Sequence, residues 1–257
     1  MIRGILETVM RISAVILAKD EEKNIGDAIK SVDFCDEVIV IDDNSTDKTV
    51  EIALSLGAKV FTRSLEDNFA GQRNFGLEKA KGEWVLFLDC DERISEKLRQ
   101  EIVAEISKPS QIKAYYIKRV DIIWGKRFRF GEYSNIKLLR VVRKGTGDWK
   151  RKVHEFWEVG GYKQTLINPV VHYPHQNLSK FIDEVNFYST LHAEENMGEG
   201  KHSSLAKIIL WPKLKFFRDT LLRLGILDGV YGFVIAILMS FHSFLAWSKQ
   251  WIRQNQR

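Results

Sequence analysis

This chain of 257 residues has only two cysteines, and we expect no secretory leader. The two cysteines, Cys35 and Cys90, cannot form a disulfide framework. The chain does not open on a basic stretch followed by an apolar run and a small-residue cleavage site. The last four histidines show no spacing typical of a zinc site. We therefore expect a reduced, cytoplasmic protein that folds without disulfides.

An excess of positive charge is absent from the first 200 residues. The formal net charge of the chain is +5, but residues 201–257 hold nine basic and two acidic residues, or +7, so residues 1–200 carry −2. This distribution argues against a generally basic, nucleic-acid-binding protein. Because the positive charge belongs to an apolar segment, we expect residues 201–257 to contact an anionic membrane surface.

The carboxyl-terminal segment combines basic and apolar residues. Residues 205–224 have the composition of a basic helix that lies in a membrane interface. Residues 229–247 run for 19 residues without a formal charge apart from titratable His242. Because a bilayer span needs about 20 apolar residues, we favour embedding in one leaflet or burial in a helical pair over a span. A core helix of a soluble domain stays as the alternative.

Strands and helices alternate in the first part of the chain. Apolar runs and helical spacing together predict a doubly wound, mainly parallel α/β sheet with right-handed crossovers. We expect strands over 12–17, 37–41, 59–62 and 84–88, and helices over 25–32, 50–56 and 68–80. Ser45 or Thr46 is expected to cap the second of these helices.

The alternation stops near residue 95. We expect a helix over 95–106, strand-like runs over 114–120, 136–142, 153–156 and 167–173, and a helix over 178–197. Such strands without helices between them indicate a mixed or antiparallel sheet. We therefore divide the chain into a domain of residues 10–200, with halves 10–95 and 96–200, and a helical extension of residues 201–257.

Acidic residues gather where the predicted parallel strands end. Asp89 and Asp91 follow the fourth strand, and Cys90 between them is expected to point into the sheet as a small apolar residue. Asp42 and Asp43 follow the second strand. Open α/β sheets bind ligands at the carboxyl ends of their strands, and paired carboxylates there can hold a divalent cation with a phosphate. The sequence therefore predicts a metal and diphosphate site at this edge.

Three segments, at 38–47, 72–76 and 84–92, resemble in order and spacing the successive motifs of family 2 inverting glycosyltransferases. Enzymes of this family use nucleotide sugars and have the GT-A fold. The resemblance implies that residues 10–95 form a nucleotide-sugar-binding half and residues 96–200 an acceptor half.

Further segments at 153–155, 172–173 and 227–232 resemble the bacterial subgroup that adds glucose or a related sugar to the inner core of lipopolysaccharide. Asp20 departs from the family, which usually has asparagine before the first glutamate. The Gln-x-x-Arg-Trp sequence of processive polysaccharide synthases is absent, which favours transfer of a single sugar.

The resemblance makes Asp91 the first ligand of a Mn²⁺ or Mg²⁺ ion. It implies that Asp89 contacts the ribose of the nucleotide, or contacts the metal through a water molecule. Such an ion would neutralise the leaving diphosphate as a Lewis acid. His172, at a strand end, is a further candidate for the metal or the diphosphate, against the alternative of an ordinary hydrogen-bonded histidine. The alternative for the two aspartates is a pair of solvated loop acids.

The nucleotide contacts also follow from the resemblance. It makes Asp42 and Asp43 contacts of the ribose and uracil and places Glu21 in the same pocket. Arg73 is the cation that we expect to reach the diphosphate, because a guanidinium donates in a bidentate manner. The alternative is a surface charge for Arg73, and helix capping for Asp43 and Asp47.

Inverting transfer needs a general base that deprotonates the acceptor hydroxyl. We choose Glu155 over Asp148 and Asp121, because Glu155 matches the motif of the subgroup and lies in a glycine-poor segment. The alternative is that Glu155 only pairs with a nearby lysine or arginine.

We therefore expect a metal-dependent glycosyltransferase at the cytoplasmic face of the inner membrane. It would move a sugar, with glucose as the leading candidate, from a UDP-sugar to the lipopolysaccharide core or another glycolipid. The alternatives are another nucleotide sugar in capsule, exopolysaccharide or glycoprotein assembly, and a non-catalytic membrane-attached sugar-nucleotide binder. A nucleotidyltransferase is disfavoured, since residues 18–24 contain no glycine for a triphosphate loop. The basic, aromatic loop 124–130 either binds the acceptor or is solvated.

Overall fold

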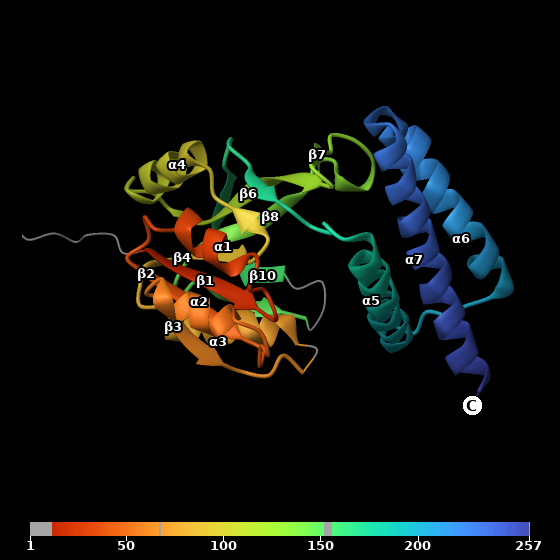
Figure 1. Ribbon diagram of the computed structural model, residues 1–257, viewed down its shortest axis with the longest axis horizontal. Helices are drawn as coiled ribbons and strands as arrows, with labels where there is room; N and C mark the ends of the chain where they lie inside the picture. Colours follow the sequence, from red (N-terminus) through yellow and green to blue (C-terminus); the bar gives the residue numbers. More distant parts are fainter. Residues whose placement is uncertain (1–11, 67, 152–155, 257) are drawn as a thin grey trace, which may run out of the picture. The chain divides into compact units, whose positions relative to one another are not determined.

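The computed structural model describes residues 12–66, 68–151 and 156–256 (Figure 1). The chain forms two compact units. The first comprises the described residues up to Arg119 together with Lys137–His172, and the second comprises Val120–Ile136 and the described residues from Tyr173 onward.

The first unit is built on a sheet with the strand order β3-β2-β1-β4-β8-β6-β12-β5, in which β11 and β7 also pair with β6. The four leading strands are β1 (Ile12–Ala18), β2 (Glu37–Asp42), β3 (Lys59–Thr62) and β4 (Trp84–Asp89). These strands are parallel, whereas β8 (Lys137–Arg143) pairs antiparallel with both β4 and β6 (Ile112–Ile123). The predicted parallel half followed by a mixed half is confirmed.

Helices cover both faces of this sheet. They are α1 (Ile25–Ser31), α2 (Thr49–Ser55), α3 (Phe69–Lys79) and α4 (Glu96–Ile106). Side chains of α1, α2 and α4 join the core on one face with Ala14 and Ile16 of β1, and side chains of α3 join the core on the other face with Val15. Because β1 is covered on both faces, its residues form the continuous apolar run that predicted it.

Most of the elements that the sequence did not predict are short strands. They are β5 (Glu92–Arg93), β7 (Lys126–Arg127), β9 (Gly147–Lys150) and β11 (Tyr162–Thr165), whereas β10 (Phe156–Val159) and β12 (Val170–His172) overlap predicted runs. The predicted cap of α2 is wrong. Ser45 and Thr46 bond instead to Asp20, and Asp47 accepts from the backbone N–H of Thr49 at 2.9 Å. Thr49 is the first residue of α2, but the N-cap position belongs to Lys48, which makes no side-chain capping bond.

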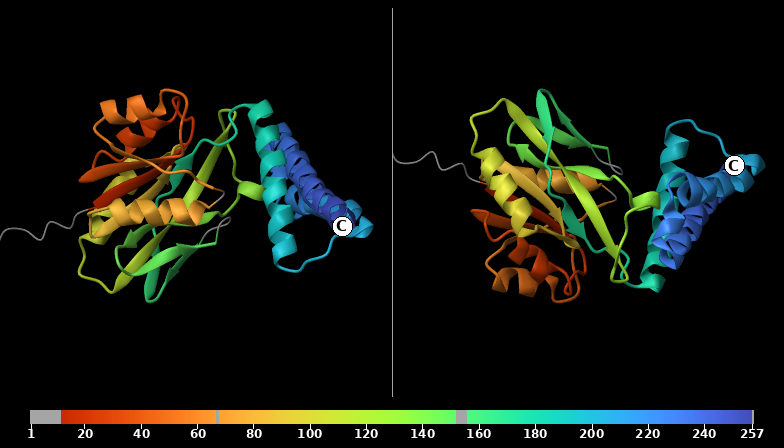
Figure 2. Two further views of the ribbon diagram at one scale, coloured as in Figure 1. Left: turned by 90° about the horizontal axis from the view of Figure 1, so that it is seen from below. Right: turned by 90° about the horizontal axis from the view of Figure 1, so that it is seen from above.

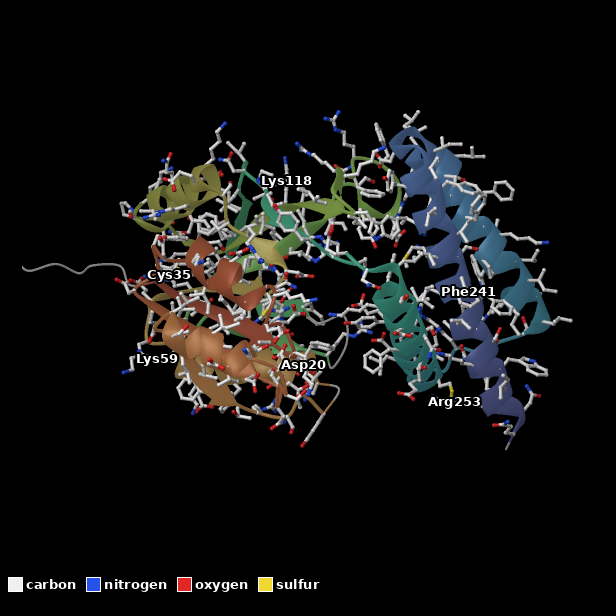
Figure 3. The ribbon with its side chains drawn as sticks, in the orientation of Figure 1. Asp20, Cys35, Lys59, Lys118, Phe241 and Arg253 are labelled. Carbon is white, nitrogen blue, oxygen red and sulfur yellow. The ribbon has the colours of Figure 1, made fainter. Side chains whose placement is uncertain are left out.

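The second unit is mainly helical. It contains η1 (Gly131–Tyr133), α5 (Leu178–Gly198), α6 (Leu205–Phe217), the π-helical η2 (Arg218–Leu222), the 3₁₀-helical η3 (Gly225–Asp228) and α7 (Val230–Asn255). Helix α7 packs against both α5 and α6, and the three run side by side (Figures 1 and 2). Phe241 is one of several large apolar side chains that α7 leaves exposed (Figure 3).

Helix α7 is longer than the predicted 19-residue run. Among the described residues, it is the one helix long and apolar enough to cross a membrane, judged by length and composition alone. A single helix of this kind is weak evidence for a span, since core helices of soluble proteins meet the same criterion.

Candidate active site

The carboxyl ends of β1, β2 and β4 meet at one edge of the sheet, as predicted. In the parallel registers Ala18 pairs with Asp42, and Leu17 pairs with Asp89. Asp42 is buried, and its Oδ2 accepts from the backbone N–H of Ser45 at 3.1 Å. Its Oδ1 is buried without a hydrogen-bond partner among the described residues. Asp42 therefore keeps an acceptor available at this edge.

Asp43 anchors the segment after β3. Its Oδ1 accepts from the backbone N–H of Leu65 at 2.9 Å, and its Oδ2 lies 4.0 Å from Nζ of Lys19. These partners exclude the helix-capping alternative for Asp43, because neither belongs to α2. The predicted contact with the nucleotide stays a prediction.

The loop after β1 is tied to the loop after β2. Asp20 has a left-handed backbone, with φ of 50°, and its Oδ1 accepts from the backbone N–H of Thr46 at 2.7 Å and from the Thr46 hydroxyl at 3.1 Å. The backbone hydrogen bond from Thr46 lowers the pKa of Asp20. Glu21 accepts from the Asn24 amide at 2.6 Å. Asp20, the departure from the family pattern, thus joins the two acidic loops.

Two arginines hold Asp89. Nη2 of Arg73 lies 2.9 Å from Oδ1, and Nη2 of Arg140 lies 2.5 Å from Oδ2. Arg73 is only 5% exposed, and its guanidinium carbon lies 5.1 Å from the centre of the Trp149 ring. The alternative of a surface charge for Arg73 is therefore wrong. Both arginines present a buried positive charge where the strands end.

Arg140 was not predicted, and it bridges two carboxylates. The same Nη2 donates to Oε1 of Glu92 at 2.6 Å, and Oε2 of Glu92 accepts from the backbone N–H of Asp89 at 3.1 Å. Burial raises the pKa of Asp89, but the charges of Arg140 and Arg73 lower it further, so that it ends well below its usual range. Burial raises the pKa of Glu92. The sequence signal that could have identified Arg140 is its position inside the apolar run of β8, because arginine is almost never buried unless it is paired.

Arg140→Lys is expected to lower the free energy of unfolding by about 2 kcal/mol, because the ammonium stops short of the Nη2 position and loses a charge-assisted hydrogen bond. Urea unfolding at neutral pH measures this. Arg143→Lys on the same strand is the matched control. Its pair with Glu83, at 2.6 Å, is about one-third exposed on both sides, so the change should stay below about 1 kcal/mol. Equal changes in the two variants would contradict a bridging role for Arg140.

Asp91 lies beside His172. Oδ2 of Asp91 is 3.1 Å from Nε2 of His172, which is largely buried. The contact arises because β12 pairs antiparallel with β5, where His172 lies opposite Glu92. Burial raises the pKa of Asp91, but the hydrogen bond and charge of His172 lower it further. The structure thus brings together two of the three residues proposed as metal ligands, although these two lie far apart in the sequence.

A carboxylate and an imidazole are donors that Mn²⁺ accepts. The described residues contain no group of three or more acidic, histidine or cysteine side chains arranged to hold a metal ion. Magnesium-type sites usually have only one or two protein carboxylates, because substrate phosphates and water complete the coordination. Asp91 and His172 therefore fit an ion that binds together with a diphosphate. The metal roles of Asp91, Asp89 and His172 stay predictions.

Glu155 lies outside the described residues. The competing candidates for the base are described. Asp121 is fully buried, and the carboxylate of Asp148, which is mostly exposed, lies 3.5 Å from Nζ of Lys150. Full burial disfavours Asp121 as a group that meets an acceptor from solvent.

Comparisons with known proteins identify relatives of this chain. The model of glycosyl transferase family 2 matches residues 13–156. The chain is 32% identical to an uncharacterized glycosyltransferase of Rickettsia typhi, over 93% of this chain and 86% of that protein. It is 28% identical to the lipopolysaccharide core biosynthesis glycosyltransferase LpsC of Rhizobium meliloti, over 93% of this chain and 91% of that protein. The solved structure of glucosyl-3-phosphoglycerate synthase from Mycobacterium tuberculosis is 27% identical over 44% of each chain, with a TM-score of 0.37.

Proposed function

The chain belongs to glycosyl transferase family 2, and we propose that it is a metal-dependent, inverting enzyme of glycolipid assembly. It would move one sugar, with glucose as the leading candidate, from a UDP-sugar to a hydroxyl of the lipopolysaccharide core or a similar acceptor. The similarity to LpsC over most of both chains supports this acceptor class. The observation that carries the proposal is the Asp91–His172 pair next to an arginine-held Asp89 at the carboxyl edge of the sheet.

The positions of the side chains support the roles that we propose for them. A divalent cation held by Asp91 and His172 would neutralise charge on the leaving diphosphate. Arg73 and Arg140 keep Asp89 ionised and fixed in orientation, which preorganises the edge where the donor would bind. The free acceptor atom of Asp42 suits an N–H or O–H group of the nucleoside.

The transfer itself requires a base on the face of the sugar opposite the diphosphate. The acceptor oxygen would form a bond to the anomeric carbon while the bond from that carbon to the diphosphate breaks. The hydroxyl proton would pass to the carboxylate of Glu155. Attack from the opposite face inverts the anomeric configuration.

Residues 201–257 would hold the enzyme at the cytoplasmic face of the membrane. Their charge of +7 and the apolar surface of α6 and α7 support this proposal.

Calorimetric titration of UDP-, GDP- and CMP-sugars tests the donor class. We expect one UDP-sugar to bind in the presence of Mn²⁺ or Mg²⁺ and to lose affinity when chelator removes the ion. Binding of a GDP- or CMP-sugar alone would show that the donor is not a UDP-sugar. Binding that survives chelator would contradict the metal role, and no binding under any metal would overturn the transferase proposal.

A further inference from the structure

The connection between α6 and α7 exposes an unusual set of apolar side chains. Leu222 is 82% exposed and Val230 is 77% exposed. We define the apolar tip as the exposed residues Leu221, Leu222, Leu224, Ile226, Leu227 and Val230. The tip lies where the two helices meet, at the upper end of the helical unit in Figure 1. Contiguous exposed apolar groups on a soluble protein mark a binding surface.

The backbone of the apolar tip is built to hold these side chains outward. Leu224 has a left-handed backbone with φ of 57°, which is a rare and strained conformation for leucine. A Cβ atom on Gly225 would lie 2.4 Å from the carbonyl oxygen of Asp219, and one on Gly232 would lie 2.0 Å from that of Gly225. The turn is therefore closely packed, and its apolar side chains are exposed by a fixed backbone.

Below the tip, Asp228 fastens the turn to the β7 hairpin. Its Oδ2 accepts from the backbone N–H groups of Arg129 and Phe130 at 3.1 and 3.0 Å, and its carbonyl oxygen accepts from Nζ of Lys126 at 2.5 Å. The hairpin and the tip thus form one structure within this unit. The exposed Arg127 and Arg129 lie on that hairpin.

The acidic side chains of residues 201–257 are buried, whereas basic side chains near the tip are exposed. Both acidic residues of 201–257, Asp219 and Asp228, are buried, at 1% and 4% exposure. The side chains of Arg218 and Arg223 stay about two-fifths exposed although both pair with Glu132 and with Asp219. With Arg127 and Arg129 they form what we call the basic collar. The tip is therefore apolar, and the segments next to it, including the hairpin that Asp228 binds, carry exposed positive side chains.

Polar contacts tie the carboxyl-terminal part of α7 to α5. Nζ of Lys249 donates to the side chains of Asn186, Ser189 and Thr190 of α5 at 2.7 to 2.8 Å. Near the other end of α7 from the tip (Figure 3), Arg253 pairs with Glu194 of α5 at 2.6 Å. A span by α7 would draw these polar groups of α5 into the hydrocarbon, where polar groups are costly.

We propose that the apolar tip inserts into the headgroup region of an anionic leaflet while the basic collar binds lipid phosphates, so that α7 does not cross the bilayer. This inference deepens the membrane attachment proposed above and rests on it. A second copy of the chain is a poorer occupant. A two-fold interface would place each tip against its own copy, and the two collars would repel.

Flotation of the full-length protein with vesicles tests the proposal. Wild-type protein should float with phosphatidylcholine vesicles that contain phosphatidylglycerol and much less with phosphatidylcholine alone. Leu222→Glu should weaken partitioning about tenfold or more, because it removes a leucine that would be buried in the leaflet and adds an anion. Arg127→Gln and Arg129→Gln should each weaken it about fivefold. Ile167→Glu in the first unit, at an 80% exposed isoleucine, is the matched control and should bind as wild type.

A fluorescent label at the tip gives an independent measure. NBD attached at Leu222→Cys, in a Cys35→Ser background, should shift to the blue on anionic vesicles, and the same label at Ile167→Cys should not. Equal partitioning of Leu222→Glu and Ile167→Glu, or no shift at the tip, would overturn the inference. A dimer that Leu222→Glu dissociates would assign the tip to a protein interface instead. Affinity for the UDP-sugar, measured in parallel, should be unchanged in every variant. Failure of donor binding in the wild type would overturn the proposed function and leave the vesicle result standing.

Discussion

Asp91→Asn is expected to lower turnover by about 10³-fold, because it removes a charged ligand of the cation that would neutralise the leaving diphosphate. The lowered pKa of Asp91 means that the carboxylate is ionised at neutral pH. The amide keeps the shape and can still bond to His172, so the fold should be retained. Steady-state kinetics over a range of Mn²⁺ concentrations, together with thermal unfolding, measure both effects.

The control for this variant is a carboxylate of the same unit that has only a surface role. Asp33 is 67% exposed and lies 3.1 Å from Arg99, so Asp33→Asn should leave turnover unchanged. His172→Gln should lower turnover less, by about 10- to 100-fold, if the imidazole supports the ion from beside Asp91. Wild-type turnover in Asp91→Asn, with the metal dependence intact, would show that the ion binds elsewhere.

The parallel half of the fold could be predicted from sequence because its signals are local. The strands β1, β2 and β4 each contain an apolar run of their own, and the helices between the strands follow from spacing and turn residues. The carboxylate edge then follows from topology, since parallel strands end on the same side. Asp42 and Asp89 lie at that edge for this reason.

The contacts that the sequence did not reveal depend on pairing between strands that lie far apart in the chain. Arg140 reaches Asp89 and Glu92 only because β8 packs antiparallel against β4, some 50 positions further along the chain. His172 meets Asp91 only because β12 pairs with β5. The cap of α2 was wrong for a similar reason, since Asp20 from a distant loop takes the bonds of Ser45 and Thr46. Short polar strands such as β11 also carry no periodic signal that is long enough to recognise.

Glu155→Gln is expected to lower kcat by about 10²- to 10⁴-fold and to leave the affinity for the UDP-sugar unchanged, because a general base acts on the acceptor proton and not on the donor. The glutamine keeps the size of the side chain and removes only its basicity. Rapid-quench turnover at saturating donor and acceptor measures the first effect, and calorimetric titration of the UDP-sugar measures the second.

Two variants on the neighbouring strands make this test specific. Glu158→Gln is the matched control, because Glu158 on β10 is 69% exposed and lies 3.9 Å from Lys150, as expected for a surface acid. Asp148→Asn tests the competing base on β9, whose carboxylate shares the same lysine. Loss of turnover in Glu155→Gln alone would assign the proton to Glu155. Loss in Asp148→Asn with full activity in Glu155→Gln would move the base to β9, which is the outcome that contradicts the motif-based assignment. All three side chains belong to one short stretch of chain, so a general loosening of this region would lower turnover in all three variants and also weaken donor binding. An unchanged donor affinity therefore separates the loss of a base from the loss of structure.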